Sequence, residues 1–474
     1  MKKLLSGVIV IIAIMLSFSA LPVSAEPANI PDGNSAAENV SIAVEEELLP
    51  PPAGLTAEGA VLIEQHTGKA LHGKQEHKQL YPASTTKILT ALIAAEYGHL
   101  DEVVTVGDEI NLIAWDGTKA GLVQDEKITM RNLILGMLIN SGNDAANTIA
   151  VHIARSVSGK ALPTQDALNY FSGMMNKRAR EAGALDSNFV NPHGYHDPNH
   201  YTTPYDLAMI SRAAMENEFF RQAISVTSMD TTYWATGEPR FWRSKNKLLN
   251  KSDPEYYEYA TGGKTGYTSK SGQCLVSFAT KDGLDLITVV MKSASGQQWS
   301  DTKTLFEYGF SNYEYDPVLK HGTIVETLPV ENYASDDWGS LAVEISSENW
   351  GDVFHKRDIP EIRKEIQWDQ SLLADKKGSA DTLPRLNAPI TKGQVIGELK
   401  VTLRGEVLAS TPLTAVRDVK KRTVLDILTP GESKNGFPWI IPVASIALAF
   451  LMLKIIVFFI NRRRRRRYYL YRRY

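Results

Sequence analysis

A largely apolar run of 24 residues near the C-terminus limits most strongly what this chain can fold into. Residues 437–460 contain one charged side chain, Lys454, and Arg462–Arg467 follow directly. At about 1.5 Å per residue a helix of this length spans roughly 36 Å, enough for a tilted crossing of a hydrocarbon layer about 30 Å thick. The sequence therefore predicts a transmembrane helix at 437–460. Because short basic flanks stay in the cytoplasm, 461–474 is the predicted cytoplasmic tail.

The N-terminal end has the pattern of an export signal. Lys2 and Lys3 precede the apolar run Leu4–Leu16, and Val23-Ser24-Ala25 places small residues at the third and first positions before a cleavage site. This pattern predicts a secretory signal peptide at 1–25. With the C-terminus inside, residues 26–436 are expected on the outer side of the cell membrane, held there by a single crossing.

Charge and cysteine content narrow the possible partners. The segment 26–460 carries 41 Lys and Arg against 54 Asp and Glu, so an acidic body precedes a short basic tail. This balance argues against nucleic acid as a partner. Cys274 is the only cysteine, which excludes an intrachain disulfide and a cysteine-based zinc site. Because it lies in an apolar run, we expect it to be a buried strand residue.

Composition divides the exported part into a linker and two domains. Residues 26–54 contain three consecutive Glu and three consecutive Pro with few large apolar side chains, which is typical of a linker. Between 55 and 317, helical spacing in the middle is flanked by strand-like runs, which predicts a sheet covered by helices. Residues 318–428 favour a small β-rich domain, since the segment 395–403 alternates with a period of two.

Several elements of the first domain can be placed by their spacing. Strands are expected at 60–63 and 70–71, around a tight turn, and at 275–278 and 286–290. Helices are expected from Pro82 to Tyr97, ending at Gly98, and from about Asn143 to Val157, ending at Gly159. A further helix is capped by Thr129, and a closing helix is expected at 300–310.

Ser84 and Lys87 are the first candidate catalytic residues. Their spacing of three places both on one face of a helix, near its positive N-terminal end. A serine hydroxyl is a weak nucleophile that needs a base beside it, and a neutral lysine can serve. The pattern is weak alone, because Ser244–Lys247 and Ser300–Lys303 match it too.

Two further motifs make the pattern specific. Ser141-Gly142-Asn143 lies in the turn between two expected helices, and Lys264-Thr265-Gly266 precedes an apolar strand. In this order and context the three motifs form the serine acyl-transfer set of penicillin-binding proteins and class A β-lactamases.

The chain resembles the low-molecular-weight penicillin-binding proteins that act as D-alanyl-D-alanine carboxypeptidases, over about residues 55–428. The resemblance rests on the three motifs and on the segments 191–194 (NPHG) and 197–208 (DPNHYTTPYDLA). It implies an α/β fold, a β-lactamase/DD-peptidase-like sandwich of helices on a mainly antiparallel sheet, followed by a small β-rich domain. It also implies a peptidoglycan stem peptide ending in D-Ala-D-Ala as substrate, β-lactams as inhibitors, and no cofactor or metal.

The resemblance also assigns roles to individual residues. Ser84 would form the acyl ester, and Lys87 would be its general base, which requires a pKa lowered by burial and by the charge of Lys264. Ser141 would pass a proton to the leaving amine. The binding residues would be Asn143 for the substrate amide, Lys264 and Thr265 for the terminal carboxylate, and the backbone N–H groups of Ser84 and Tyr267 for the oxyanion. Arg243 or Lys245 could also contact the carboxylate.

Three other interpretations are weighed against this one. His193, His196, Asp197 and His200 could suggest a metal site, but Pro192, Gly194 and Pro198 break any helix there, and the family's corresponding loop carries no metal. A β-lactamase would need a glutamate that activates the deacylating water, and we find no Glu-x-x-x-Asn between Ser141 and Lys264. A non-catalytic β-lactam receptor would need a larger cytoplasmic domain. Endopeptidase or transpeptidase activity on the same peptides stays open.

Overall fold

The structure is a computed structural model, and it describes residues 48–233, 237–374, 383–424 and 440–470. The predicted signal peptide at 1–25 lies outside the described residues, as do 26–47 of the predicted linker. The remaining linker residues, 48–54, form no helix or strand and are mostly exposed. Leu55 is the first buried residue of the chain that follows.

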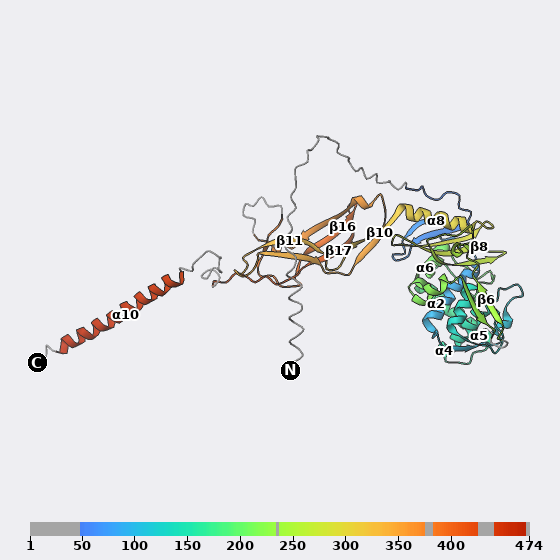
Figure 1. The fold of residues 1–474 in the computed structure, drawn as a ribbon, viewed down its shortest axis with the longest axis horizontal. Helices are drawn as coiled ribbons and strands as arrows, with labels where there is room; N and C mark the ends of the chain where they lie inside the picture. Colours follow the sequence, from blue (N-terminus) through green and yellow to red (C-terminus); the bar gives the residue numbers. More distant parts are fainter. Residues whose placement is uncertain (1–47, 234–236, 375–382, 425–439, 471–474) are drawn as a thin grey trace, which may run out of the picture. The chain divides into compact units, whose positions relative to one another are not determined.

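A five-stranded antiparallel sheet forms the centre of the first domain (Figure 1). Its order is β2 (Ala70–Lys74), β1 (Gly59–Glu64), β9 (Leu284–Ser293), β8 (Gly272–Lys281) and β7 (Ala260–Thr268). The strands predicted at 60–63, 70–71, 275–278 and 286–290 are therefore confirmed. Strand β7 lies at an edge, so one side of its backbone is not paired within the sheet.

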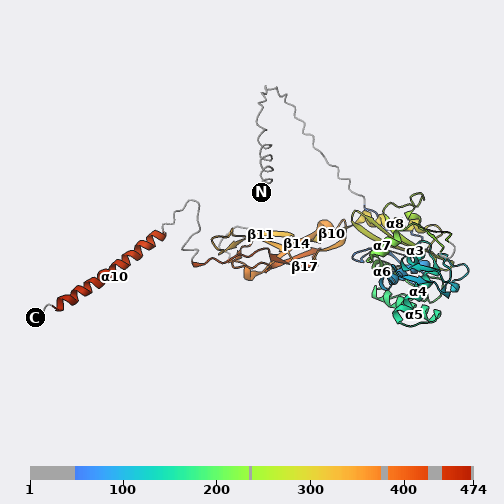
Figure 2. The same ribbon diagram turned by 60° about the horizontal axis from the view of Figure 1, so that its bottom comes forward.

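Both faces of this sheet are covered, which explains why β8 and β9 are apolar without alternation. Val61 and Ile63 belong to one hydrophobic cluster, whereas the intervening Leu62 belongs to another on the opposite face. Helix α8 (Gln298–Asn312) covers the second face through Leu305 and Phe306. Helices α6 (Pro204–Met215) and α7 (Glu218–Ser225) pack against the first face. Four further helices share the same hydrophobic cluster and pack on these two and on one another (Figures 1 and 2): α2 (Lys87–Tyr97), α3 (Met130–Ile139), α4 (Asn143–Ser158) and α5 (Thr164–Glu181).

Local capping explains where the helices begin and end. The Thr129 hydroxyl accepts a hydrogen bond from the backbone N–H of Asn132, which confirms the predicted cap of α3. Helix α4 ends at Gly159, whose φ of 64° favours glycine. The remaining short elements are β3 (Val103–Thr105), β4 (Lys127–Thr129), β5 (Ser228–Thr232), β6 (Pro239–Arg243) and 3₁₀ turns at Ala83–Thr86, Asp108–Leu112 and Lys247–Leu249.

The second domain is β-rich, as the sequence predicts. Strands β14 (Ile362–Trp368), β16 (Val395–Leu403), β17 (Glu406–Ala415), β12 (Ser340–Ile345), β11 (Ile324–Glu331) and β15 (Leu386–Asn387) form one sheet in that order, and β10 (Tyr313–Leu319) pairs with β13 (Trp350–His355). Two 3₁₀ turns lie at Ile359–Glu361 and Gln370–Leu372. Its first strand follows α8 directly, so these strands begin at Tyr313 rather than at 318.

Helix α10 (Ile440–Leu470) covers most of the segment for which the sequence predicts a membrane crossing. It continues without a break from apolar residues into Arg462–Arg467. Within the described ranges, no helix has the combination of length and hydropathy that a membrane crossing needs. The structure therefore does not support the transmembrane helix predicted at 437–460, of which 437–439 lie outside the described residues.

Candidate active site

Ser84 lies in a 3₁₀ turn, Ala83–Thr86, that leads directly into α2. The predicted helix from Pro82 is thus wrong for its first turn. Thr85 and Thr86 donate their hydroxyl protons to the backbone oxygens of Pro82 and Ala83, at 2.7 and 2.8 Å, which closes the turn tightly. The turn presents the Ser84 side chain to a cleft while Lys87, the first residue of α2, points inward.

The side-chain nitrogen of Lys87 is enclosed by three oxygen atoms. Nζ lies 3.1 Å from Ser84 Oγ, 2.7 Å from Asn143 Oδ1 and 2.8 Å from the backbone oxygen of His193. The side chain is fully buried. Burial, and then the nearby charge of Lys264, lower the pKa of Lys87 well below its ordinary value, whereas Asp144 acts in the opposite direction.

The three contacts match the hydrogen-bonding capacity of a neutral amine. Such an amine has two N–H donors and one lone pair, and the oxygens of Asn143 and His193 can only accept. When these two carbonyls take both N–H groups, the lone pair is left for the Ser84 hydroxyl. The arrangement can therefore remove a proton from Ser84 without an additional base.

Ser141 and Lys264 form a second pair across the cleft. Ser141 has a φ of 59°, and it lies in the turn between α3 and α4. Lys264 extends from β7 and donates hydrogen bonds to Ser141 Oγ at 3.0 Å and to the Thr265 backbone oxygen at 2.9 Å. Burial, followed by the charge of Lys245, lowers the pKa of Lys264 to about 7.

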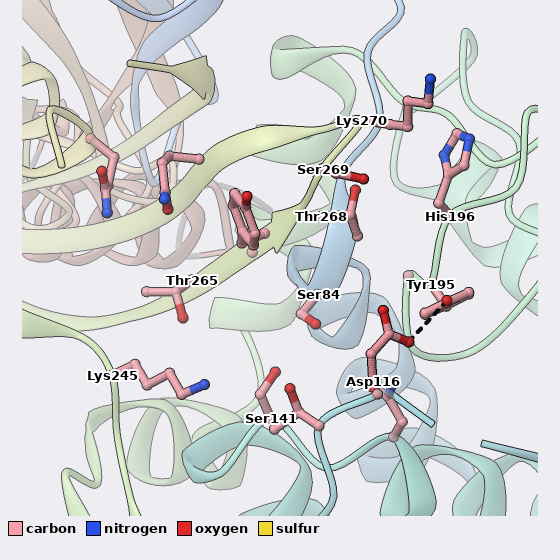
Figure 3. A pocket seen from close by; sticks show the side chains of 18 of the residues that line it. Ser84, Asp116, Ser141, Tyr195, His196, Lys245, Thr265, Thr268, Ser269 and Lys270 are labelled. Atoms are coloured by element: carbon pink, nitrogen blue, oxygen red, sulfur yellow. Dashed lines mark hydrogen bonds between the residues drawn. The ribbon is translucent and has the colours of Figure 1, made fainter. Parts of the chain in front are cut away.

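The cleft between these elements has a volume of about 610 Å³ (Figure 3). Ser84, Ser141, Asn143, Thr265 and Tyr267 all line it. Strand β7 approaches the serine turn closely at Gly266, where a Cβ atom would lie 2.8 Å from the Pro82 oxygen and 3.1 Å from the Ser84 nitrogen. Glycine is needed there because any side chain would push β7 away from the serine.

The structure distinguishes Arg243 from Lys245 by their positions relative to the cleft. Lys245 lines the cleft, below Thr265 in Figure 3. The Arg243 guanidinium instead donates a hydrogen bond to exposed Asp230 at 2.8 Å. Lys245 is therefore the better placed of the two to meet a carboxylate.

The histidine-rich loop supports the serine turn. His200 Nε2 lies 2.9 Å from Thr86 Oγ1, and burial lowers the pKa of His200 to about 3. His193 contributes its backbone oxygen to Lys87. Among the described residues, no group of three or more His, Cys, Asp or Glu is arranged to hold a metal ion. Cys274 is buried in β8, as the sequence predicts.

Asp144 is a residue of the site that the sequence motifs do not indicate. Its carboxylate is buried, and it accepts hydrogen bonds from the backbone N–H groups of Ala120, Gly121, Leu122 and Ala145 at 2.7 to 3.0 Å. The loop before α3 is thereby fixed against the start of α4. The only signal in the sequence is its position directly after Asn143, where an acidic residue suits the first turn of a helix.

The fold and the site define a class of protein, an α/β DD-peptidase domain followed by a β-rich domain. A family model described as D-alanyl-D-alanine carboxypeptidase matches residues 46–295, and one described as penicillin-binding protein 5, C-terminal domain, matches residues 313–421. The chain belongs to the D-alanyl-D-alanine carboxypeptidase family. It is a serine-type D-alanyl-D-alanine carboxypeptidase, a peptidase hydrolase.

Individual relatives and solved structures match this chain over most of its length. DacF of Bacillus subtilis, a D-alanyl-D-alanine carboxypeptidase, is 29% identical over 382 residues, which covers 78% of this chain and 88% of the relative. The crystal structure of penicillin-binding protein 5 from Haemophilus influenzae matches with a TM-score of 0.56 at 28% identity, covering 78% of this chain and 100% of that one. Penicillin-binding protein 6B from Escherichia coli matches with a TM-score of 0.57 at 25% identity, covering 77% and 96%.

Proposed function

We propose that this carboxypeptidase acts through an acyl-enzyme on Ser84, with Lys87 as the general base. Ser84 Oγ attacks the carbonyl carbon of the penultimate D-Ala, the bond to the last D-Ala breaks, and water then hydrolyses the ester. The observation that carries the proposal is the position of Lys87 Nζ, 3.1 Å from Ser84 Oγ with two carbonyl oxygens on its other sides. Buried lysines with lowered pKa values are suited to this role.

The other motif residues are given the roles that their positions support. Ser141 carries a proton to the leaving amine, because its hydroxyl lies between the cleft and Lys264. Lys264, with Thr265, binds the terminal carboxylate, and Asn143 holds the substrate amide. The backbone N–H groups of Ser84 and Tyr267 stabilise the oxyanion, a contribution of about 10²–10³ in rate per donor in comparable enzymes.

The substrate is proposed to be a peptidoglycan stem peptide ending in D-Ala-D-Ala, bound as an added strand along β7. The unpaired edge of β7 lies beside Ser84, which places backbone groups where an extended peptide can pair with them. β-Lactams are proposed to acylate the same serine. The cleft-lining residues of the described chain include no glutamate, which agrees with slow hydrolysis of a β-lactam adduct rather than β-lactamase activity.

The proposal is tested by locating the adduct. After incubation with penicillin, peptide mass spectrometry should find one adduct, on Ser84, and Ser84→Ala should abolish it. Ser244→Ala, which changes the serine of another Ser-x-x-Lys match, is the control and should retain it. An adduct on another residue would contradict the assignment of Ser84. Release of D-Ala from a pentapeptide, measured in parallel, distinguishes an enzyme from a receptor.

We also propose that the protein is held at the cell membrane by its C-terminal apolar segment, with the catalytic domain outside. The support is the composition of 437–460 and the arginines that follow. Full-length protein should stay in the membrane fraction after alkaline extraction, and a chain ending at 436 should appear in the soluble exported fraction. Membrane retention of the shortened chain would contradict the anchor.

A further inference from the structure

A single carboxylate lines a cleft that is otherwise cationic or neutral. Among the cleft-lining residues that the structure describes, Asp116 is the only acidic one, whereas Lys245 and Lys270 are cations. Cations suit a site for a peptide that ends in a carboxylate. A carboxylate does not, because it would repel the substrate unless it lies where the substrate carries positive charge.

Asp116 lies at the end of the cleft that the terminal carboxylate does not occupy. Figure 3 shows Thr265 and Lys245 on one side of Ser84, and Asp116 with Tyr195 on the other. If the carboxylate binds at Thr265 and the scissile carbonyl lies at Ser84, the residues on the acyl side continue away from Thr265. Each extended residue advances about 3.3 Å, so the residue before D-Ala-D-Ala reaches the end of the cleft that contains Asp116.

Asp116 is held by a contact to one wall of the site, and its loop is held by a contact to the other. The Tyr195 hydroxyl donates a hydrogen bond to Asp116 Oδ1 at 3.0 Å, and both side chains are exposed to the cleft. Tyr195 follows Gly194, where a Cβ atom would clash with the Ala83 oxygen of the serine turn. On the other wall, Asn143 N–H donates to the Thr118 oxygen at 2.8 Å, which fixes the loop of Asp116 to the start of α4.

A fixed carboxylate beside an exposed tyrosine ring has the chemistry of an ammonium site. The carboxylate supplies the opposite charge, and the ring face attracts cations through its quadrupole. Lys270, which also lines the cleft, extends away from Asp116 in Figure 3.

We propose that Asp116 recognises an ammonium group on the acyl side of the substrate, so that the enzyme prefers peptides in which the residue before D-Ala-D-Ala is a diamino acid with a free amine. This inference rests on the proposed acyl-enzyme at Ser84. It makes Asp116 a specificity-determining residue, with Tyr195 as the group that positions its carboxylate.

The test compares two tripeptides that differ only in this charge. They are Nα-acetyl-L-Lys-D-Ala-D-Ala, with a free side-chain amine, and its Nα,Nε-diacetyl form. In the full-length protein, the ratio of their kcat/KM values should favour the free amine. Asp116→Asn, which keeps an acceptor for Tyr195, should lower this ratio by roughly 3- to 10-fold, the range of a solvent-accessible to partly desolvated ion pair. Asp116→Lys should reverse the preference.

Controls separate this role from a general effect on the loop. Asp166→Asn, at an exposed position in the first turn of α5, should leave the ratio unchanged. The preference of the unaltered protein should also shrink when salt is raised from 0.05 to 0.5 M, since screening weakens accessible charge pairs (Debye lengths of roughly 14 and 4 Å). If Asp116→Asn slows both tripeptides equally, or changes neither, the inference is overturned.

The same variants show which proposal fails. Penicillin labelling of Ser84 is measured on each protein before the tripeptides are compared. If Ser84 is labelled but the ratio does not respond to Asp116→Asn and Asp116→Lys, the ammonium site is refuted and the acyl-enzyme stands. If Ser84 is never labelled and the ratio does not respond, both proposals fail.

Discussion

The two domains differ in whether they bury charged side chains. The catalytic domain buries Lys87, Lys264, Asp144, Glu126 and Arg240, each less than 5% exposed. In the described part of the β-rich domain, no charged residue is buried, and the buried polar residues are three threonines, Thr402, Thr411 and Thr414. Burying a charge costs several kcal/mol unless it is compensated. The catalytic domain therefore contains buried groups that can serve in catalysis, whereas the interior of the β-rich domain serves packing.

The buried charges of the catalytic domain are themselves of two kinds. Arg240 and Glu126 form an ion pair at 2.7 Å, and Asp144 is satisfied by four backbone N–H groups. Among the described residues, no carboxylate forms an ion pair with Lys87 or Lys264, and the pKa of each is lowered. Compensated charges hold the structure together, whereas uncompensated ones are available for proton transfer and for substrate charge.

The largest effect is expected from Lys87. Replacing Lys87 by Ala removes the proposed base, so the rate of Ser84 acylation by penicillin should fall by roughly 10²–10⁴. The measurement is the rate of adduct formation by mass spectrometry, together with circular dichroism to check the fold. Lys177→Ala, an exposed lysine on α5, is the control. Near-normal acylation in a folded Lys87→Ala protein would remove Lys87 from the role of base.

Asp144 should show what a compensated buried charge contributes. Asp144→Ala leaves four backbone donors without their acceptor and should lower the free energy of unfolding by roughly 2–4 kcal/mol, measured by urea denaturation. Asp144→Asn keeps one acceptor oxygen and should cost less. Because residues 116–118 of the loop that Asp144 holds line the cleft, acylation should also slow in the folded fraction. Unchanged stability in Asp144→Ala would show that water replaces the carboxylate.

Lys264 should impose a pH dependence on substrate binding. Its pKa of about 7 means that its charge is present below that pH and is lost above it. If the ammonium binds the terminal carboxylate, kcat/KM for a D-Ala-D-Ala peptide should fall as the pH rises through 7. Lys264→Arg keeps the charge, so this alkaline decline should move up by more than one pH unit. A decline at the same pH in both proteins would assign it to another group.

The same pKa shift has a consequence for stability. The unfolded chain holds a proton on Lys264 up to its ordinary pKa of 10.5, whereas the folded chain releases it near 7. Since the unfolded state binds more protons in this window, the contribution of Lys264 to the free energy of unfolding should rise with pH between about 7 and 10. Lys264→Arg should flatten that rise.

Local signals predicted the regular parts of the fold. The strands at 275–278 and 286–290, the Thr129 cap and the end of α4 at Gly159 depend on neighbouring residues alone, and each is confirmed. The 3₁₀ turn at Ser84 and the early start of β10 depend on partners far along the chain, such as Gly266 and β13. These partners are set by the tertiary fold, so sequence periodicity cannot reveal them.

The sequence indicated which motifs meet, and the structure brings their side chains together, while the catalytic roles stay predictions. Lys87 donates a hydrogen bond to Ser84, and Lys264 donates one to Ser141, so the four residues form two pairs. The positions of Asp144 and Asp116 were not predicted, because they depend on which backbone groups or which cleft each carboxylate faces. The choice between Arg243 and Lys245 likewise required coordinates, since both are near the same motif in sequence.

The smallest effect on activity is expected from the β-rich domain. Leu328 is fully buried in β11, and Leu328→Ala should lower the stability of that domain by roughly 2–5 kcal/mol through the cavity it leaves. D-Ala release from a small soluble peptide should stay within roughly twofold, because Leu328 belongs to a hydrophobic cluster that shares no residue with those of the catalytic domain. Leu89→Ala, an equally buried leucine on the helix that carries Lys87, is the matched variant and should lower both stability and activity. If Leu328→Ala slows D-Ala release while the catalytic domain stays folded, catalysis depends on the packing of the β-rich domain, and the separation between the two domains fails.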